Sequence, residues 1–459
     1  MALITSLAAA LALQIAPPSE VAQLYEIAEA PRADRIIADV ETLVGFGTRH
    51  TLSETESETR GIGAARRWIK AEFEAISREC GGCLEVREIS GVIEGERRIP
   101  EPAEVVSIVA FQTGNLDPNR MVIMSGDIDS RVSDVMNSTD DSPGANDNAS
   151  GVAGVLEAAR VLTKYEFPGT IVYAALSGEE QGLFGGKIVA AVASEEGWRI
   201  KAVLNNDMIG NIAGVDGVIA NNSVRVFSEG LRADETPEAA RYRRFRGGEV
   251  DSPARNLARY IDKMAEVYLP NLDAEMVYRL DRFGRGGHQT PFADLGYPAV
   301  RIMETHEHYD RQHQDLRIED GRIYGDTIDW VDADYAATVT SLNMLTMAGM
   351  AGAPPFPEDV QLGGAVEASA VLSWKTGGDD RRARRNLAGY RVHWRKTTDP
   401  QWTNSRYVGN VNTWTFKNLV VDNFFFGVSA VAKDGSETPV VFPGPIGQFD
   451  PLERGEADE

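Results

Sequence analysis

The chain has 459 residues, of which 43% are hydrophobic, and a formal net charge of −23 at pH 7. This length is typical of two domains, and the apolar content suffices for a large core without a metal or disulfide staple. The acidic balance argues against nucleic acids and anionic membranes as partners, because phosphate binding depends on a surplus of Lys and Arg.

The N-terminal segment MALITSLAAALALQIAPPSE is an apolar run that ends in small residues and prolines. It is too short and too rich in Ala for a membrane span, and it is similar to a secretory signal with cleavage near Ala16. A positively charged leader is missing, so an exposed or helical extension is the alternative. We expect residues 1–18 to be a signal peptide, the protein to be periplasmic or secreted, and no later segment to span a membrane.

The two cysteines, Cys80 and Cys83, lie in the segment ECGGCLE. In an exported chain they are candidates for a local disulfide. A redox dithiol and plain thiols are the alternatives. A zinc ribbon would need a second Cys-x-x-Cys motif, and the sequence has none.

Residues 23–350 alternate apolar strand-like runs with amphipathic helical patterns, which predicts an α/β domain. Asn148 or Ser150 can cap the first of the helices. The predicted strands lie at 121–125, 170–178, 201–210 and 297–304, and the predicted helices at 150–162, 252–268 and 332–348.

The composition changes after the last of these helices. Residues 351–359 form a Gly/Pro-rich linker, and 360–447 show the short alternating runs of an all-β domain before an acidic tail at 448–459. The segments AVLSWK and FFFGVSAVAKDGSET resemble a fibronectin type III domain, which implies a β-sandwich that contacts protein or carbohydrate. The RRARR run at 381–385 is expected to be a solvated loop rather than a site for an anionic partner.

Acidic residues occur at four places near the ends of predicted elements in the first domain: after 121–125, before the helix at 150–162, after 170–178 and within 201–210. One aspartate at a strand end usually serves as a turn or a cap. Four such sites at the ends of neighbouring strands indicate a ligand crevice, and clustered carboxylates require cations. The acidic residues are Asp127, Asp129, Asp147, Glu179, Glu180 and Asp207.

Histidines strengthen the interpretation as a metal site. The chain has six, and four lie between positions 288 and 313: His288, His306, His308 and His313. A lone histidine is more often structural than a ligand, but a cluster downstream of several carboxylates favours metal binding.

Four segments together carry a family resemblance: PGANDNASGVAGVLEAARVL, SGEEQGLFGG, NNDMIG and HYDRQHQD. They resemble motifs of the co-catalytic zinc aminopeptidases, metallopeptidase family 28, over residues 105–350 and in the family's order. The resemblance implies a mixed, mostly parallel sheet with helices on both faces, and a peptide substrate.

The resemblance also implies a role for each matching residue. Asp147 matches the carboxylate that bridges two zinc ions, and Glu179 matches the general base. Glu180 and His313 match further ligands of one metal, and Asp207 matches a ligand of the other. Asp129 matches the carboxylate that supports the first ligand. His288 has no ligand role in the family pattern.

The chain departs from the family at one ligand, because Asp127 stands where the motif Gly-His-x-Asp has its histidine. Carboxylates also bind zinc, so Asp127 is retained as a predicted ligand. The site of Asp127, Asp147 and Asp207 would be all oxygen and would tolerate another divalent ion. Two metals are therefore expected, with a one-metal enzyme as the alternative.

The leading hypothesis is a metallo-aminopeptidase that removes N-terminal residues through a metal-activated water. One alternative is a glutaminyl cyclase-like aminoacyl transferase, a one-metal relative. Cleavage at the carboxyl end of acidic peptides is a variant of the leading hypothesis. A binding protein of the same fold with impaired catalysis is the alternative from another class.

Overall fold

The computed structural model describes residues 16–452. Most of the predicted signal peptide and residues 453–459 of the acidic tail lie outside the described residues. No helix within the described range is long and apolar enough to cross a membrane.

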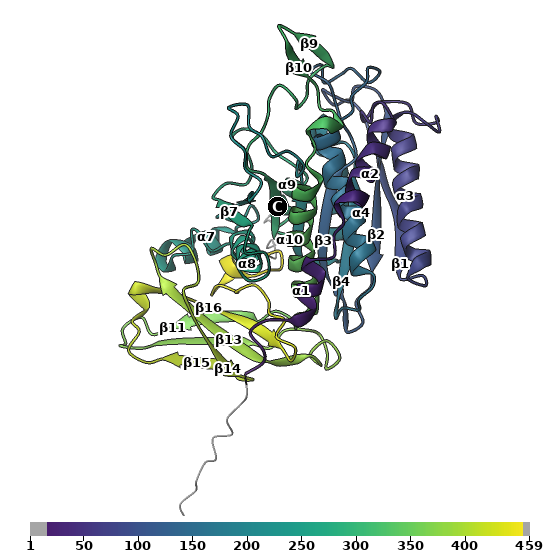
Figure 1. Ribbon diagram of the computed structural model, residues 1–459. Coiled ribbons are helices and arrows are strands. Elements are labelled where there is room, and N and C mark those ends of the chain that lie inside the picture. The colour runs from purple at the N-terminus through teal and green to yellow at the C-terminus, as the bar shows by residue number, and fades with distance from the viewer. Residues whose placement is uncertain (1–15, 453–459) are drawn as a thin grey trace, which may run out of the picture.

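An eight-stranded mixed sheet forms the centre of the first domain (Figure 1). Its order is β1-β2-β4-β3-β5-β8-β6-β7, and the neighbours β4, β3, β5 and β8 run parallel. The predicted α/β fold with a mixed sheet is confirmed. The strands are β1 (Leu84–Ile93), β2 (Ala103–Gln112), β3 (Asp117–Asp127), β4 (Gly169–Leu176), β5 (Arg199–Asn206), β6 (Ser223–Ser228), β7 (Asp273–Val277) and β8 (Ala299–Glu304).

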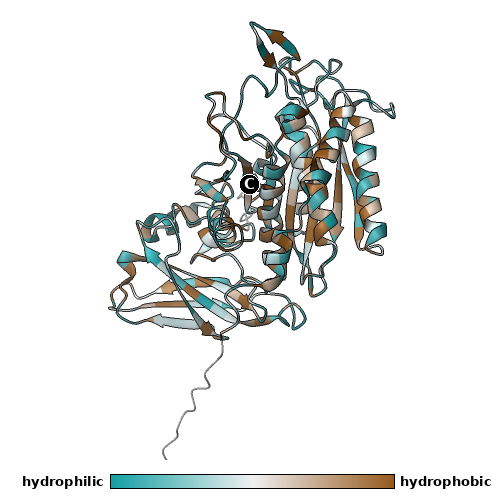
Figure 2. Ribbon diagram, viewed as in Figure 1, coloured by the Kyte–Doolittle hydropathy of each residue, from teal (hydrophilic) through white to brown (hydrophobic). Residues whose placement is uncertain are grey.

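Helices cover both faces of this sheet, because side chains on a strand alternate between its faces. On β3, Val122 and Met124 belong to one hydrophobic cluster and Ile123 to another. The strands carry mostly hydrophobic residues (Figure 2), as burial on two faces requires. The helices α1 (Ala22–Ala28), α2 (Ala33–Gly45), α3 (Gly61–Glu79), α4 (Gly151–Leu162), α8 (Pro253–Tyr268) and α10 (Ala333–Gly352) pack on the first cluster, and α6 (Phe184–Glu195) and α9 (Gln289–Asp294) on the second.

The predicted helices at 150–162, 252–268 and 332–348 correspond to α4, α8 and α10. Oδ1 of Asn148 accepts the backbone N–H of Gly151 at 3.1 Å, so Asn148 caps α4, whereas Ser150 makes no side-chain cap. The last helix extends to Gly352, two residues into the predicted linker. The chain also forms the helix α7 (Pro237–Arg246) and a hairpin of β9 (Arg317–Glu319) and β10 (Arg322–Tyr324).

The segment between α3 and β1 contains a disulfide between Cys80 and Cys83. It closes a short turn in which Gly81 and Gly82 both have positive φ. Glycine is the residue that adopts this conformation without a steric penalty.

The C-terminal domain consists of two three-stranded antiparallel sheets, as its all-β pattern predicted. Its specific likeness to fibronectin type III stays a prediction. One sheet has the order β11-β12-β15 and the other β14-β13-β16. The strands are β11 (Glu358–Gly363), β12 (Ala370–Lys375), β13 (Leu387–Lys396), β14 (Asn404–Gly409), β15 (Thr413–Phe416) and β16 (Phe424–Ala432).

Buried ion pairs join the C-terminal sheets to the first domain. Asp251, just before α8, accepts hydrogen bonds from Arg395 of β13 at 2.7 and 2.8 Å and from Arg259 at 2.9 Å. The described start of the acidic tail returns to the first domain, where Asp450 pairs with Lys201 of β5. The second domain is therefore held against the first by charge as well as by apolar contacts.

Candidate metal centre

The predicted site residues lie at the edge of the sheet where its parallel strands end. Asp127 is the last residue of β3, Asp207 directly follows β5, and Glu179 begins the short helix α5 (Glu179–Gly182) after β4. Because β3, β4 and β5 run parallel, their carboxyl ends open at one edge. This edge is where open α/β sheets bind ligands.

Three of the five predicted ligands converge on one point. Within residues 16–452, Asp147, Glu180 and His313 are the one set of three whose ligand atoms all lie within 4.8 Å of one another. Nε2 of His313 lies 2.9 Å from Oδ2 of Asp147 and 2.7 Å from Oε1 of Glu180. Carboxylate oxygen and imidazole nitrogen are both ligands of zinc, so these three residues fit a zinc ion.

Asp147 is held by neighbours from distant parts of the chain. It lies in an irregular helical turn, η1 (Ala145–Ser150), that precedes α4. The carboxylate of Asp326 accepts the backbone N–H of Asp147 at 2.7 Å, and Nε2 of Gln312 donates to Oδ2 of Asp147 at 3.1 Å. These bonds orient the carboxylate that the family resemblance assigns to the metal.

Asp129 holds the segment that carries the adjacent glutamates. Its buried carboxylate accepts the backbone N–H of Glu179 at 3.1 Å and that of Glu180 at 3.0 Å. The hydroxyl of Thr51 donates to the same carboxylate at 3.0 Å. Asp129 therefore supports the ligand Glu180. From the family resemblance we expected it to support the residue at position 127 instead.

The electrostatics of the group suit a cation. Burial alone would lower the pKa of His313, but Glu180 and Asp147 outweigh it and raise that pKa to about 9. Burial, and then repulsion from Glu180 and Asp207, raises the pKa of Glu179 well above its ordinary value. Two of the buried carboxylates are thus already paired with a cationic imidazole, and the repulsion at Glu179 is of the kind that a bound cation relieves.

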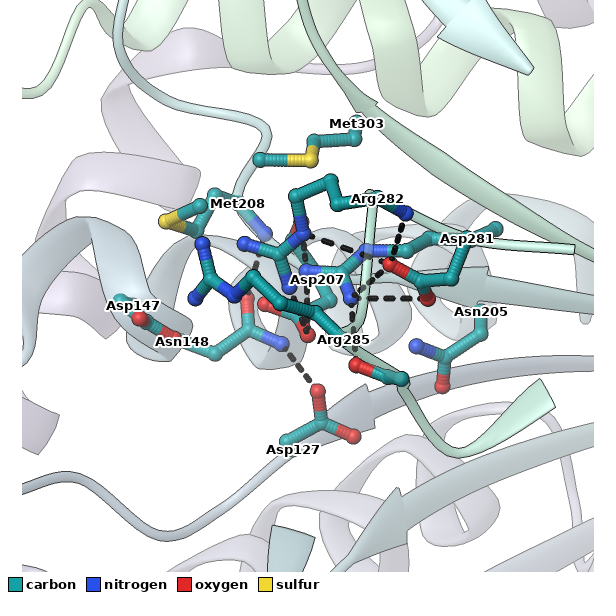
Figure 3. A network of polar contacts seen from close by, with 12 residues as sticks. Asp127, Asp147, Asn148, Asn205, Asp207, Met208, Asp281, Arg282, Arg285 and Met303 are labelled. Atoms are coloured by element: carbon teal, nitrogen blue, oxygen red, sulfur yellow. Dashed lines mark hydrogen bonds and ion pairs between the residues drawn. The ribbon is translucent and has the colours of Figure 1, made fainter. Parts of the chain in front are cut away.

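Asp127 does not join the three converging ligands. Its Oδ1 lies 2.5 Å from Nδ1 of His288. Its Oδ2 accepts a hydrogen bond from Nδ2 of Asn148 at 2.8 Å, which Figure 3 shows. Burial lowers the pKa of His288 to about 4, so the imidazole that faces Asp127 is neutral at ordinary pH. His288 has no ligand role in the family pattern. In this protein its Nδ1 contacts one carboxylate oxygen of Asp127.

Asp207 also has a partner other than a metal. Nη2 of Arg301 lies 2.7 Å from Oδ2 of Asp207, and Nη1 of Arg301 lies 3.0 Å from Oδ2 of Asp281. Arg301 is completely buried on β8, which pairs with β5. The guanidinium of Arg301 neutralises the carboxylate of Asp207, which is the task that a second metal ion would have at this position. The residues at this position therefore do not fit the second metal ion.

Arg131 contacts two of the three converging ligands. Its Nε donates to Oε2 of Glu180 at 2.7 Å, and its Nη2 lies 2.6 Å from Nδ1 of His313. An imidazole that binds a metal through Nε2 keeps its proton on Nδ1. Since two donors cannot share a hydrogen bond, Nη2 of Arg131 is not hydrogen-bonded to the ring whenever Nδ1 carries a proton, as it does in an imidazolium or in an imidazole that binds a metal through Nε2.

A cavity of about 450 Å³ opens above these residues. Asp147, Glu179, Glu180, Asp207 and His313 all line it. The base and the converging ligands thus share one space large enough for a small ligand.

Several of these functional residues escaped prediction from the sequence. Arg301 stands inside the apolar run YPAVRIME, and a charge within a buried strand was a usable signal. Arg131 lies two residues after Asp129, directly beyond the strand. Nothing in the sequence indicated Asp326 or Gln312, because their roles depend on how the loops around β9 and β10 fold back.

Comparison with known proteins agrees with the family resemblance. Residues 107–322 match the family described as Peptidase family M28. A "Probable zinc metalloprotease" of Pyrenophora tritici-repentis (strain Pt-1C-BFP) is 39% identical over 94% of this chain and 88% of that protein. Another "Probable zinc metalloprotease", from Pyricularia oryzae (strain 70-15), is 41% identical over 94% of this chain and 88% of that protein. The LapA aminopeptidase of Legionella pneumophila shares the fold, with a TM-score of 0.51 and 18% identity over 72% of each chain. The chain belongs to peptidase family M28 and is a metal-dependent peptidase.

Proposed function

We propose that the protein is an exopeptidase that binds one zinc ion through Asp147, Glu180 and His313. The observation that carries the proposal is the convergence of these three side chains on one point. Asp207 pairs with Arg301 instead of joining them, which is why one zinc ion is proposed and not two. The resemblance of the sequence to family aminopeptidases supports cleavage at the amino end, and the N-terminal apolar run supports export.

The residues of the chain have distinct tasks in this reaction. A zinc ion, when bound, supplies Lewis acidity that lowers the pKa of water and polarises a carbonyl. Glu179 accepts the proton of the attacking water while the oxygen forms its bond to the scissile carbonyl carbon. When the C–N bond breaks, Glu179 returns the proton to the leaving amine. Asp129 keeps Glu179 in place by accepting its backbone N–H.

The proposal is tested with the zinc-loaded protein and aminoacyl arylamides. Glu179→Gln is expected to lower the rate by about 10²–10⁴-fold while zinc remains bound. Glu195→Gln is the matched control, because Glu195 is exposed on α6 and makes no side-chain hydrogen bond or ion pair among the described residues. Hydrolysis that persists after complete zinc removal, or full activity in Glu179→Gln, would contradict the proposal.

Glutaminyl cyclase-like transfer is the second candidate, and the one-metal ligand set favours it. A glutaminyl arylamide separates the two reactions. Hydrolysis releases the arylamine, whereas cyclisation of the N-terminal glutamine releases ammonia and leaves the arylamide bond intact. Ammonia without arylamine would establish the second candidate and exclude the first.

A further inference from the structure

We propose that the substrate carries a carboxylate that the basic walls of the cavity recognise. The inference rests on the proposed function, in which this cavity is the active site. It names the chemical class of the group that the enzyme prefers, which the metal ligands alone do not determine.

The walls of the cavity are basic although the whole chain has a net charge of −23. Four acidic residues line the cavity around the proposed zinc site, and a bound zinc ion would offset part of their negative charge: Asp147, Glu179, Glu180 and Asp207. Glu96 is the one further acidic residue of the lining. The basic residues that line the same cavity are Arg97, Arg98, Arg131, Lys187, Arg282 and Arg285.

Most acidic residues of the cavity are already engaged, which leaves little to hold a cationic side chain of the substrate. Asp207 pairs with Arg301, and both Asp147 and Glu180 contact His313. Glu179 is needed as the base. Among the described lining residues, Glu96 is the one acidic side chain left over, and it is exposed to solvent. Beyond the α-amine, the cavity is therefore better suited to an anionic group of the substrate than to a cationic one.

Several wall cations keep donors available. Arg285 bonds to Glu307 through Nη1 at 3.0 Å and remains 35% exposed. Arg97 and Lys187 are exposed, and neither forms an ion pair within the described part of the chain. A substrate carboxylate would meet these donors in a partly desolvated space, where hydrogen bonds to charged groups are strong.

The carboxylate can belong to an acidic side chain or to the free carboxyl end of a peptide. Calorimetric titration distinguishes these sources with zinc-loaded Glu179→Gln, in which turnover of the ligand is about 10²–10⁴-fold slower. One arm compares glutamic acid α-amide with glutamine α-amide, and the other compares N-acetyl-alanyl-alanine with its amide. We expect the carboxylate member of at least one pair to bind about tenfold more tightly.

Cavity variants show whether the walls or the zinc ion hold the carboxylate. Arg97→Met and Arg285→Met should each reduce the preference severalfold with unchanged zinc content, and the effect should shrink in high salt. Arg381→Met is the control, because Arg381 is exposed on the C-terminal domain and makes no described contact.

Equal affinity within both pairs would overturn the inference, and so would a preference that both cavity variants leave intact. Neither result affects the proposed function, which depends on zinc-dependent hydrolysis measured separately. Conversely, loss of the proposed function would appear as absent turnover, while the titrations would still report which member of each pair binds.

Discussion

Replacement of Asp129 by Asn tests how the catalytic glutamates are held in place. The carboxylate accepts two backbone N–H groups, from Glu179 and Glu180, together with the hydroxyl of Thr51. An amide of the same shape has one oxygen, so in either orientation its NH₂ group faces a backbone N–H. One of the two bonds to the glutamate segment must break.

The expected size of the effect follows from that count. A hydrogen bond to a charged group contributes about 1.5–3 kcal/mol, and Asp129 is buried, so solvent does not replace the lost bond. Part of this energy would appear as weaker zinc binding through Glu180 and part as slower turnover through Glu179. We expect zinc affinity to fall about 10–100-fold, in line with other residues that orient metal ligands.

Competition with a chromophoric chelator measures the affinity, and arylamide hydrolysis at saturating zinc measures the rate. Asp273→Asn is the matched control, since Asp273 is exposed on β7 and its side chain makes no described hydrogen bond. Zinc affinity and turnover in Asp129→Asn that equal those of the control would refute the idea that Asp129 positions these glutamates.

Two further predictions follow from the charges of the structure. Because the pKa of His313 is raised to about 9 without metal, zinc must displace a proton, so zinc affinity should rise about tenfold per pH unit up to about pH 9. The same shift stabilises the metal-free fold fully below about pH 6.5, and this contribution is lost as the pH rises through 9. Calorimetry in buffers of different ionisation enthalpy detects the proton, and heats that do not depend on the buffer would contradict it. Asp251→Asn leaves the buried guanidinium groups of Arg259 and Arg395 with less charge compensation and should lower the free energy of unfolding by about 3–5 kcal/mol in urea. A loss below about 1 kcal/mol would show that this interface is unimportant for stability.

The strands and helices of the first domain were predictable because their hydrophobic periods are clear. The run 121–125 and the pattern at 252–268 each became the element that its period indicated. The converging ligands were predictable from residue type and motif order, since Asp147, Glu180 and His313 all stand in segments that resemble family motifs.

The partners of Asp127 and of Asp207 could not be predicted from the sequence. The partner of Asp127, His288, lies 161 residues away in the chain, and that of Asp207, Arg301, lies on a strand that pairs with β5. A period reveals which face of a strand is buried, but not which buried charges meet across loops. For the same reason the basic walls of the cavity, assembled from four separate regions of the chain, gave no recognisable pattern.

Metal counting tests the central claim most directly. The protein, saturated with zinc and freed of loosely bound ions, is analysed by mass spectrometry for zinc per chain, alongside Asp207→Asn and His313→Ala. The account predicts about one zinc ion per chain in the parent protein and in Asp207→Asn, and almost none in His313→Ala. Two zinc ions in the parent protein, with one of them lost in Asp207→Asn, would contradict it.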